Sequence, residues 1–345
     1  MGSSEAAIAD PVRVGLIGAG RIGTSHAEVL ARRVSGARLV AVSDPRPEAA
    51  QALASHLGVR SEPDPAQLLA DPDIEAVVIA ASSQAHADLV VAASHAGKAI
   101  FCEKPMSLDL AAADRALAAA AAAGVPLQVG FNRRFDRGFA HARQVIAAGG
   151  IGTPQLMRSL TRDPGLADPA GVPPWTVFLQ TLIHDFDTLL WLNPGARATQ
   201  VYAVADALVA PDFKDAGLLD TAVVVIRFDN GAMATAEASF SAAYGYDVRA
   251  EVFGSAGMVT AGDTAQSTMV HHDRDGRHVA TARGDVALFL DAYTGEFDEF
   301  VGAVREGRDP AVSGQDARRA LEVALAAIES VRSGAAAAVE LGEQS

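Results

Sequence analysis

The chain has 345 residues, of which half are hydrophobic and a fifth are charged, so it is long enough for two globular domains and too apolar for a disordered protein. Its formal net charge of −14 argues against nucleic acid as a partner, because an acidic surface repels a phosphate backbone. The single cysteine, Cys102, allows no internal disulfide and favours a reducing, cytoplasmic location.

No part of the sequence predicts a membrane segment. Met1–Asp10 lacks the basic start and the apolar centre of a signal peptide. The Ala-rich stretch Ala111–Val125 contains Asp114, Arg115 and Gly124, so we do not expect it to span a bilayer.

The first part of the chain alternates short apolar runs with Ala-rich stretches of helical length. Such alternation predicts βαβ units and a parallel, doubly wound sheet of the α/β class. The expected strands are Val12–Ile17, Leu39–Ser43, Ala76–Ala81, Ala99–Cys102 and Leu127–Phe131, and the expected helices are Ile22–Arg33, Pro47–Leu57, Ala85–Ala96 and Leu108–Ala123.

The pattern changes after Phe131, where longer runs of strand character are joined by turns such as Asp229-Asn230-Gly231. It predicts an α+β domain with a large, mainly antiparallel sheet. The expected strands are Gln155–Arg162, Thr199–Val204, Thr221–Phe228, Met233–Phe240, Val248–Phe253 and Thr268–His272, and the expected helices are one ending near Gly149-Gly150, Phe178–Leu192, Leu288–Gly307 and Gly314–Arg332.

A glycine-rich loop lies between the first expected strand and the first expected helix. Gly18, Gly20 and Gly23 have the G-x-G-x-x-G spacing of a dinucleotide-binding turn. Gly18 would permit the tight turn, Gly20 the approach of a pyrophosphate, and Gly23 close helix–strand packing. We therefore expect this loop, with Arg21 and Ile22, to bind a dinucleotide at the helix N-terminus.

Asp44 ends the second expected strand, about 21 residues after Gly23, where a carboxylate can accept hydrogen bonds from the ribose hydroxyls of NAD. The same carboxylate would repel the additional phosphate of NADP. Arg46, two residues further on, is the one nearby group that could attract that phosphate. The pattern predicts NAD as the cofactor and residues 1–132 as its Rossmann domain, with residues 133–345 forming a domain for substrate binding and oligomerisation.

The segment Glu103-Lys104-Pro105 follows the expected strand Ala99–Cys102. Ligands of such sheets bind at the carboxyl ends of the strands. We therefore expect Glu103 and Lys104 on the nicotinamide side of the cofactor.

At this point the chain resembles the glucose-fructose oxidoreductase/inositol dehydrogenase (Gfo/Idh/MocA) family, from Val12 to about Ser333. The motifs that carry the resemblance are Gly18-Ala19-Gly20-Arg21-Ile22-Gly23, Glu103-Lys104-Pro105, Gly130-Phe131-Asn132-Arg133-Arg134-Phe135-Asp136, Ile183-His184-Asp185-Phe186-Asp187 and Pro310–Asp316. The inositol 2-dehydrogenase branch is suggested by Tyr244-Gly245-Tyr246-Asp247 and Asp291–Glu296.

The resemblance implies catalytic roles for Lys104 and His184. Lys104 would hydrogen-bond the reacting oxygen, and the peptide bond before Pro105 would be cis. His184 would take the hydroxyl proton while hydride leaves for the nicotinamide. An imidazole suits the removal of the proton near neutral pH, and a cationic donor suits the stabilisation of the oxygen.

Gln180 departs from the family pattern, which has Asp four residues before the histidine. With α-helical spacing, positions i and i+4 share one face, so Gln180 is expected beside His184. The other substrate-binding candidates are Arg134, or its neighbour Arg133, together with Asp163, Tyr246 and Tyr293.

The motifs and the resemblance predict NAD-dependent oxidation of a secondary ring hydroxyl of a cyclic polyol similar to inositol. Because of Gln180, a sugar or glycoside dehydrogenase and a biosynthetic ketone reductase stay open as alternatives. A catalytically silent NAD-binding sensor is a further alternative, against which the retention of Lys104 and His184 argues.

The resemblance also implies a homotetramer, since an antiparallel sheet needs something to cover its outer face. No metal site is expected. His271 and His272 are neighbours in the sequence, and they lack a Cys or carboxylate partner at metal-ligand spacing.

Overall fold

We describe a computed structural model of the chain, which covers residues 10–166 and 168–340. Apart from Asp10, the segment considered above as a leader lies outside the described residues. The chain forms two compact units. Unit 1 comprises Met1–Glu103, Asp114–Gly130 and Thr294–Gly314, and unit 2 comprises Lys104–Ala113, Phe131–Tyr293 and Gln315–Ser345. Within the described ranges, no helix is long and apolar enough to cross a membrane.

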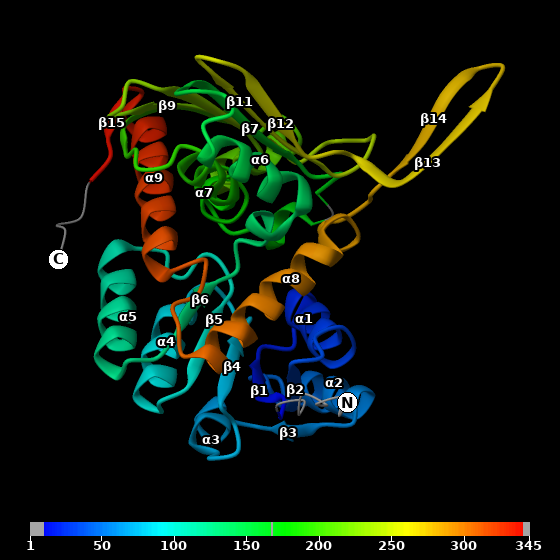
Figure 1. The fold of residues 1–345 in the computed structure, drawn as a ribbon, viewed down its shortest axis with the longest axis vertical. Helices are drawn as coiled ribbons and strands as arrows, with labels where there is room; N and C mark the ends of the chain where they lie inside the picture. Colours follow the sequence, from blue (N-terminus) through cyan, green and yellow to red (C-terminus); the bar gives the residue numbers. More distant parts are fainter. Residues whose placement is uncertain (1–9, 167, 341–345) are drawn as a thin grey trace, which may run out of the picture. The chain divides into compact units, whose positions relative to one another are not determined.

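Unit 1 is built on a six-stranded parallel sheet with strand order β3-β2-β1-β4-β5-β6 (Figure 1). Its strands are β1 (Val12–Ile17), β2 (Ala37–Ser43), β3 (Arg60–Glu62), β4 (Ala76–Ile79), β5 (Ala99–Cys102) and β6 (Leu127–Val129). The helices between them are α1 (Arg21–Arg32), α2 (Pro47–Leu57), α3 (Pro65–Ala70), α4 (His86–His95) and α5 (Leu110–Ala123).

The apolar runs of unit 1 form strands because both faces of the sheet are covered. Every residue of β4 and β5 is buried, which explains why these strands read as continuous apolar runs. Helix α2 begins at Pro47 and ends before Gly58, which has φ +69°. The expected strands and helices of this unit are confirmed to within a few residues, and only the short β3 and α3 were missed.

Unit 2 contains a seven-stranded sheet with strand order β12-β11-β7-β10-β9-β8-β15. The pairing of β7 with β10 is parallel and the other pairings are antiparallel. The strands are β7 (Pro154–Arg162), β8 (Ala198–Asp206), β9 (Thr221–Phe228), β10 (Met233–Ser239), β11 (Asp247–Gly254), β12 (Met258–Ala261) and β15 (Ala337–Ala338). The mainly antiparallel α+β domain is thus confirmed.

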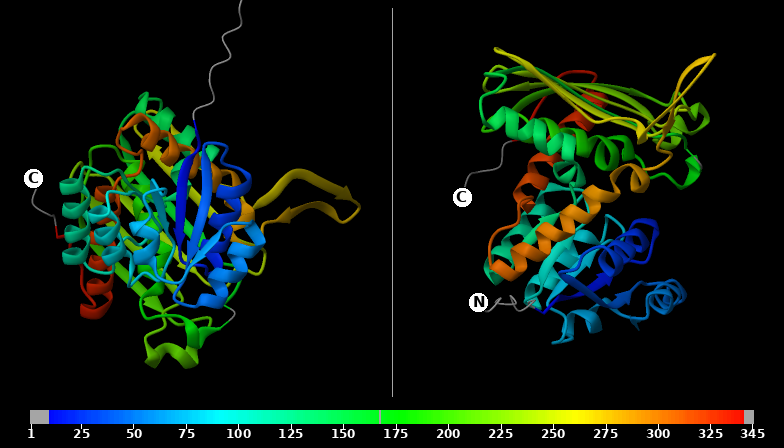
Figure 2. Two further views of the ribbon diagram at one scale, coloured as in Figure 1. Left: turned by 90° about the horizontal axis from the view of Figure 1, so that it is seen from below. Right: turned by 45° about the vertical axis from the view of Figure 1, so that its right-hand side comes forward.

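Helices cover one face of this sheet (Figure 2). They are α6 (Arg137–Ala147), α7 (Ile183–Trp191) and α9 (Gly314–Ser333). Unit 2 also contains the shorter helical turns η1 (Asn132–Phe135), η2 (Pro169–Gly171), η3 (Val177–Leu182) and η4 (Pro211–Ala216). A hydrogen bond of 2.9 Å from the Ala203 N–H to Ser330 Oγ joins β8 to α9. The long helix α8 (Asp285–Glu306) contributes residues to both units.

The strand expected at Thr268–His272 does not belong to the large sheet. It lies in β13 (Ala265–Asp273), which pairs only with β14 (Gly276–Thr281) in a hairpin that extends away from unit 2's sheet (Figure 1). His271 has a carboxylate neighbour, although the prediction that no metal binds at His271 and His272 stays untested. Asp273 lies 3.8 Å from His271 Nδ1 and 3.1 Å from Nε2 of His278, which pairs across the hairpin with His271.

Candidate active site

The glycine loop of unit 1 has the shape that a dinucleotide requires. Gly18 has φ +109°, and a Cβ atom there would lie 2.4 Å from the carbonyl oxygen of Ala80. A Cβ atom on Gly23 would lie 2.0 Å from the Gly18 oxygen, so the helix packs directly on the loop. A Cβ atom on Gly20 would meet no heavy atom of the described structure within 4 Å. The backbone is therefore open to a ligand at Gly20, beside the positive end of the α1 dipole.

Asp44 is nearly buried and is bound to the glycine loop itself. Its Oδ2 accepts a 2.7 Å hydrogen bond from the Ala19 N–H, and its Oδ1 accepts from the N–H of Arg46 at 2.9 Å. The Arg46 guanidinium adds a contact of 3.1 Å. Burial alone would raise the pKa of Asp44, but these hydrogen bonds outweigh it and leave the pKa lowered. The carboxylate is thus a fixed anion next to the loop, with lone pairs left for a ribose hydroxyl.

We expect kcat/KM with NAD to exceed that with NADP by about 100-fold or more, because juxtaposed like charges cost several kcal/mol. Steady-state kinetics with both cofactors measure the ratio. The Asp44→Ser variant, which keeps Arg46, should use NADP much better than the parent. Equal use of both cofactors by the parent protein would mean that the Arg46 guanidinium outweighs the Asp44 carboxylate.

Lys104 comes two residues after Cys102, the last residue of β5. The Glu103 N–H donates to the carbonyl oxygen of Ile79 on β4 at 2.9 Å, and the Glu103 side chain is buried. Lys104 is partly exposed, and its peptide bond to Pro105 is cis, as the resemblance implies. The backbone that carries Lys104 is therefore tied to the edge of a rigid sheet.

His184 lies in the first turn of α7 and is partly exposed. Its ring stands edge-on to Phe131, with the ring centroids 5.8 Å apart. Its Nδ1 atom is buried and has no hydrogen-bond partner among the described residues. One ring nitrogen is thus shielded, and the imidazole is held by packing.

The pKa of His184 is lowered well below its ordinary value. Desolvation is the largest cause, and the positive charges of Lys104 and Arg133 follow. The ring is consequently a neutral base at physiological pH. The charge of Lys104 thus reaches His184, and both predicted catalytic residues belong to unit 2.

The spacing argument for Gln180 was wrong in one respect. Gln180 lies in η3, a π-helical turn with i→i+5 hydrogen bonds, and α-helical geometry begins only at Ile183. The wider turn takes positions i and i+4 out of the register of an α-helix. No hydrogen bond joins Gln180 to His184 in the described structure, and the substrate-binding role of Gln180 stays a prediction.

Placing a carboxylate at position 180 should raise the pKa of His184, because an added negative charge favours the imidazolium. We expect the acid limb of the kcat/KM profile to lie at higher pH in Gln180→Asp than in the parent. Gln180→Asn is the control of equal size without the charge. If the acid limb stays in place while the preferred polyol changes, Gln180 is a specificity residue and the electrostatic explanation is wrong.

The two neighbouring arginines are both engaged by carboxylates but in different places. Arg133 is buried and donates to Asp185 Oδ1 at 2.8 Å, and its charge lowers the pKa of His184. Arg134 donates to Asp187 Oδ2 at 2.9 Å and lies over the ring of Trp191 at 5.6 Å. Of the two, Arg133 is the one that acts on His184. Substrate contact by Arg134 stays a prediction.

Sequence reasoning did not single out Asp185, although its buried carboxylate accepts several hydrogen bonds in this region. It has no exposed surface and accepts from Arg133, Ser159 and Thr161. The two hydroxyls belong to β7, so Asp185 ties α7 to the sheet. Its position next to His184 in the sequence could have drawn attention to it.

Tyr246, Asp163 and Tyr293 gather in unit 2 with a residue that sequence reasoning missed, Asp285. Burial is the largest cause of the raised pKa of Tyr246, followed by the negative charge of Asp163, with Asp285 also contributing. The Tyr293 hydroxyl lies 3.5 Å from Asp285 Oδ2. The charge of Arg133 lowers the pKa of Tyr246 and also that of His184. The same guanidinium therefore acts electrostatically on this group and on the predicted base.

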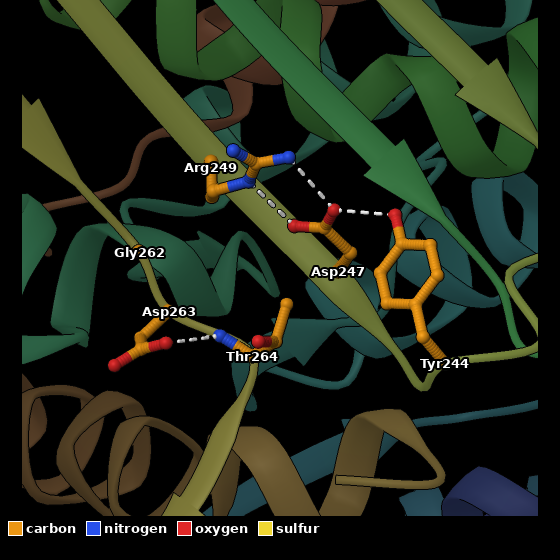
Figure 3. A pocket seen from close by; sticks show the side chains of 6 residues that line it. All are labelled: Tyr244, Asp247, Arg249, Gly262, Asp263 and Thr264. Carbon is orange, nitrogen blue, oxygen red and sulfur yellow. Dashed lines mark hydrogen bonds and ion pairs between the residues drawn. The ribbon is translucent and has the colours of Figure 1, made fainter. Parts of the chain in front are cut away.

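The motif Tyr244-Gly245-Tyr246-Asp247 divides between two places. Tyr246 joins the group above, whereas Tyr244 and Asp247 line a surface pocket of 340 Å³ with Arg249, Gly262, Asp263 and Thr264 (Figure 3). Asp247 accepts from the Tyr244 hydroxyl at 2.7 Å and pairs with Arg249. Between them Gly245 has φ +133°, and a Cβ atom there would lie 2.5 Å from Thr281 Oγ1.

The chain is similar to known proteins over nearly its whole length. Residues 12–131 match the model described as "Oxidoreductase family, NAD-binding Rossmann fold", and residues 139–260 match the GFO/IDH/MocA C-terminal domain. The chain is 39% identical to myo-inositol 2-dehydrogenase of Thermotoga maritima, over 93% of this chain and 96% of that protein. It is 37% identical to scyllo-inositol 2-dehydrogenase (NAD(+)) of Bacillus subtilis, over 94% and 95%.

Among solved structures, scyllo-inositol dehydrogenase of Lactobacillus casei with bound NAD(H) and scyllo-inositol has a TM-score of 0.90 at 28% identity, covering 96% of this chain and 99% of that one. The family models and near full-length relatives extend through both units of the fold. The chain belongs to the GFO/IDH/MocA oxidoreductase family and carries its NAD-binding Rossmann fold.

Proposed function

We propose that this protein oxidises a secondary ring hydroxyl of a cyclic polyol of the inositol class, with NAD as the hydride acceptor. The observation that carries the proposal is the setting of His184 in unit 2, where desolvation and then the charge of Lys104 lower the pKa of the imidazole. The inositol dehydrogenases among the relatives support the substrate class.

The two residues divide the work of alcohol oxidation. His184, neutral because of its surroundings, accepts the hydroxyl proton. Lys104 donates a hydrogen bond to the same oxygen and stabilises the charge that develops on it. NAD, when bound, supplies a nicotinamide carbon that accepts the hydride. Because desolvation, and after it the charges of Lys104 and Arg133, lower the pKa of His184, the base is available without prior deprotonation at neutral pH.

Hydroxyl recognition is assigned to the group of Asp163, Tyr246, Asp285 and Tyr293. Two carboxylates and two phenols supply acceptors and donors for several ring hydroxyls, which suits a polyol better than a simple alcohol. Gln180 is the feature that favours a second candidate, a sugar or glycoside dehydrogenase or a ketone reductase of the same family. A neutral amide there adds both a donor and an acceptor in place of a charge.

A substrate panel tests the proposal. NADH formation is followed by absorbance with myo-inositol, scyllo-inositol, aldoses and glycosides, and NAD binding is measured separately by calorimetry. Turnover with an inositol supports the proposal, and turnover restricted to aldoses or glycosides supports the second candidate. Tight NAD binding without turnover on any substrate would point to a sensor.

We also propose a homo-oligomer, on the evidence of the sheet face of unit 2 that helices leave open. Exposed apolar side chains pair across neighbouring strands there, in a row formed by Met258, Phe253, Leu156 and Met233. Tyr202 pairs with Val225 beyond it. An apolar patch of this kind marks an interface. Light scattering should give a tetramer, and Phe253→Glu should dissociate it.

Two other expectations are proposed on the same footing. Residues 1–132 would act as the cofactor domain and residues 133–345 as the domain for substrate and assembly. The single cysteine, Cys102, supports a reducing, cytoplasmic location.

A further inference from the structure

A buried cluster in unit 1 lies directly behind the segment that leads to Lys104. It consists of His26 on α1, Glu103 after β5 and Glu296 on α8, whose ligand atoms all lie within 4.8 Å of one another. His26 and Glu296 have no exposed surface, and Glu103 is 4% exposed. His26 Nε2 lies 2.6 Å from Glu103 Oε1, within hydrogen-bond distance.

Two phenylalanine rings pack against His26 and restrict the orientation of its imidazole. Its ring is edge-on to Phe101 and to Phe297, with centroid distances of 5.8 Å and 4.9 Å. On the other side of the contact, a Cβ atom at Gly130 would lie 3.1 Å from Glu103 Oε1. The Glu103 carboxyl group therefore packs against Gly130, and a side chain at position 130 would crowd it.

The contact fixes the chain at the point from which Lys104 emerges. Glu103 is held at its backbone by the carbonyl of Ile79 and at its carboxylate by His26. Lys104 is the next residue. We propose that His26 is a positioning residue for the oxidation: it holds Glu103 and thereby the backbone from which the Lys104 side chain reaches the reacting oxygen. This inference rests on the proposed function.

A matched pair of substitutions at position 26 tests the contact. The side-chain amide of Gln has the reach of Nε2, whereas that of Asn, one methylene shorter, does not. With the NAD-bound full chain, we expect His26→Gln to retain most of kcat and His26→Asn to lose about 10- to 100-fold, because small displacements of a catalytic group have effects of this size. NAD affinity should change less than about threefold in either.

His56 supplies the control, because its Nε2 also pairs with a glutamate on α1, Glu28, at 2.7 Å, but at the exposed surface. His56→Asn should leave kcat unchanged. Near-normal kcat in His26→Asn, or equal loss in His26→Gln and His26→Asn, would overturn the proposal. Should His26→Asn fail to fold, the double variant His26→Asn/Glu103→Gln replaces the buried carboxyl group of Glu103 with an amide of the same size. Its kcat should lie about 10- to 100-fold below that of Glu103→Gln, and equality would overturn the proposal.

A second readout does not depend on turnover. The chain has three lysines, Lys98, Lys104 and Lys214, so ¹³C-dimethylation gives a simple NMR spectrum. In the parent and in His26→Gln, the chemical shift of dimethylated Lys104 should differ from that of a mobile, exposed lysine. In His26→Asn it should move towards the value of a mobile lysine. An unchanged Lys104 resonance in His26→Asn would exclude positioning by His26. A parent protein inactive on every substrate would instead refute the proposed function.

Discussion

Replacing Lys104 with Met is expected to lower kcat by about 10² to 10³, the usual effect of removing one donor from a developing oxyanion. Met is one heavy atom shorter than lysine, retains most of the volume of its side chain, and removes the charge and the donor. NAD affinity should be preserved, because the glycine loop and Asp44 are untouched. Steady-state kinetics and calorimetric NAD titration measure the two effects separately.

Lys104→Met should have a second consequence, because the Lys104 charge is one cause of the lowered His184 pKa. Without it, the pKa of His184 rises, and the acid limb of the residual kcat/KM profile should move to higher pH. Lys214→Met is the control, since Lys214 is exposed and paired with Asp206. Turnover close to that of the parent would remove Lys104 from the chemistry.

Replacing His184 with Asn is expected to lower kcat by about 10² to 10⁴, the range for loss of a general base. The acid limb of the pH profile should disappear with the imidazole, because no titrating base is left at that position. Residual activity should rise with hydroxide concentration. The NAD binding constant should stay close to that of the parent.

His141→Asn is the matched control, because His141 is an exposed histidine on α6 of the same unit. It should leave both kcat and the profile unchanged. A His184→Asn protein that keeps its acid limb would show that another group, with Lys104 the first to examine, titrates in the parent.

Local sequence patterns predicted the parts of the fold that depend on burial and backbone conformation. Continuous apolar runs located β4 and β5 because both of their faces are covered. Strand β3, Arg60–Glu62, has no buried residue. Its sequence therefore shows no hydrophobic pattern from which a strand could be predicted. The hairpin formed by β13 and β14 is largely exposed as well. The alternation of apolar and polar residues predicts a strand but does not show to which sheet the strand belongs.

The glycine loop was predictable because Gly18 and Gly23 each meet a local steric demand and Gly20 leaves the backbone open to a ligand. The choice between Arg133 and Arg134 was not, since neighbouring residues in a short helical turn are told apart only by their partners on α7, Asp185 and Asp187. Asp285 is distant in sequence from Tyr246 and could be found only from the tertiary structure.

The π-helical turn at Val177–Leu182 shows the limit of spacing arguments. A helix was correctly expected there, but a periodicity of 3.6 was assumed for it. No residue type in Val177–Leu182 marks the wider turn.

The transfer of hydride from a ring carbon to NAD is the central claim, and an isotope label tests it most directly. The parent protein is incubated with NAD and with myo-inositol or scyllo-inositol deuterated at every ring carbon, and the reduced cofactor is analysed by mass spectrometry. The account predicts NADH that carries one deuterium on its nicotinamide ring, together with a slower reaction than with unlabelled inositol. NADH without deuterium, or no NADH from either inositol while NAD is bound, would contradict it.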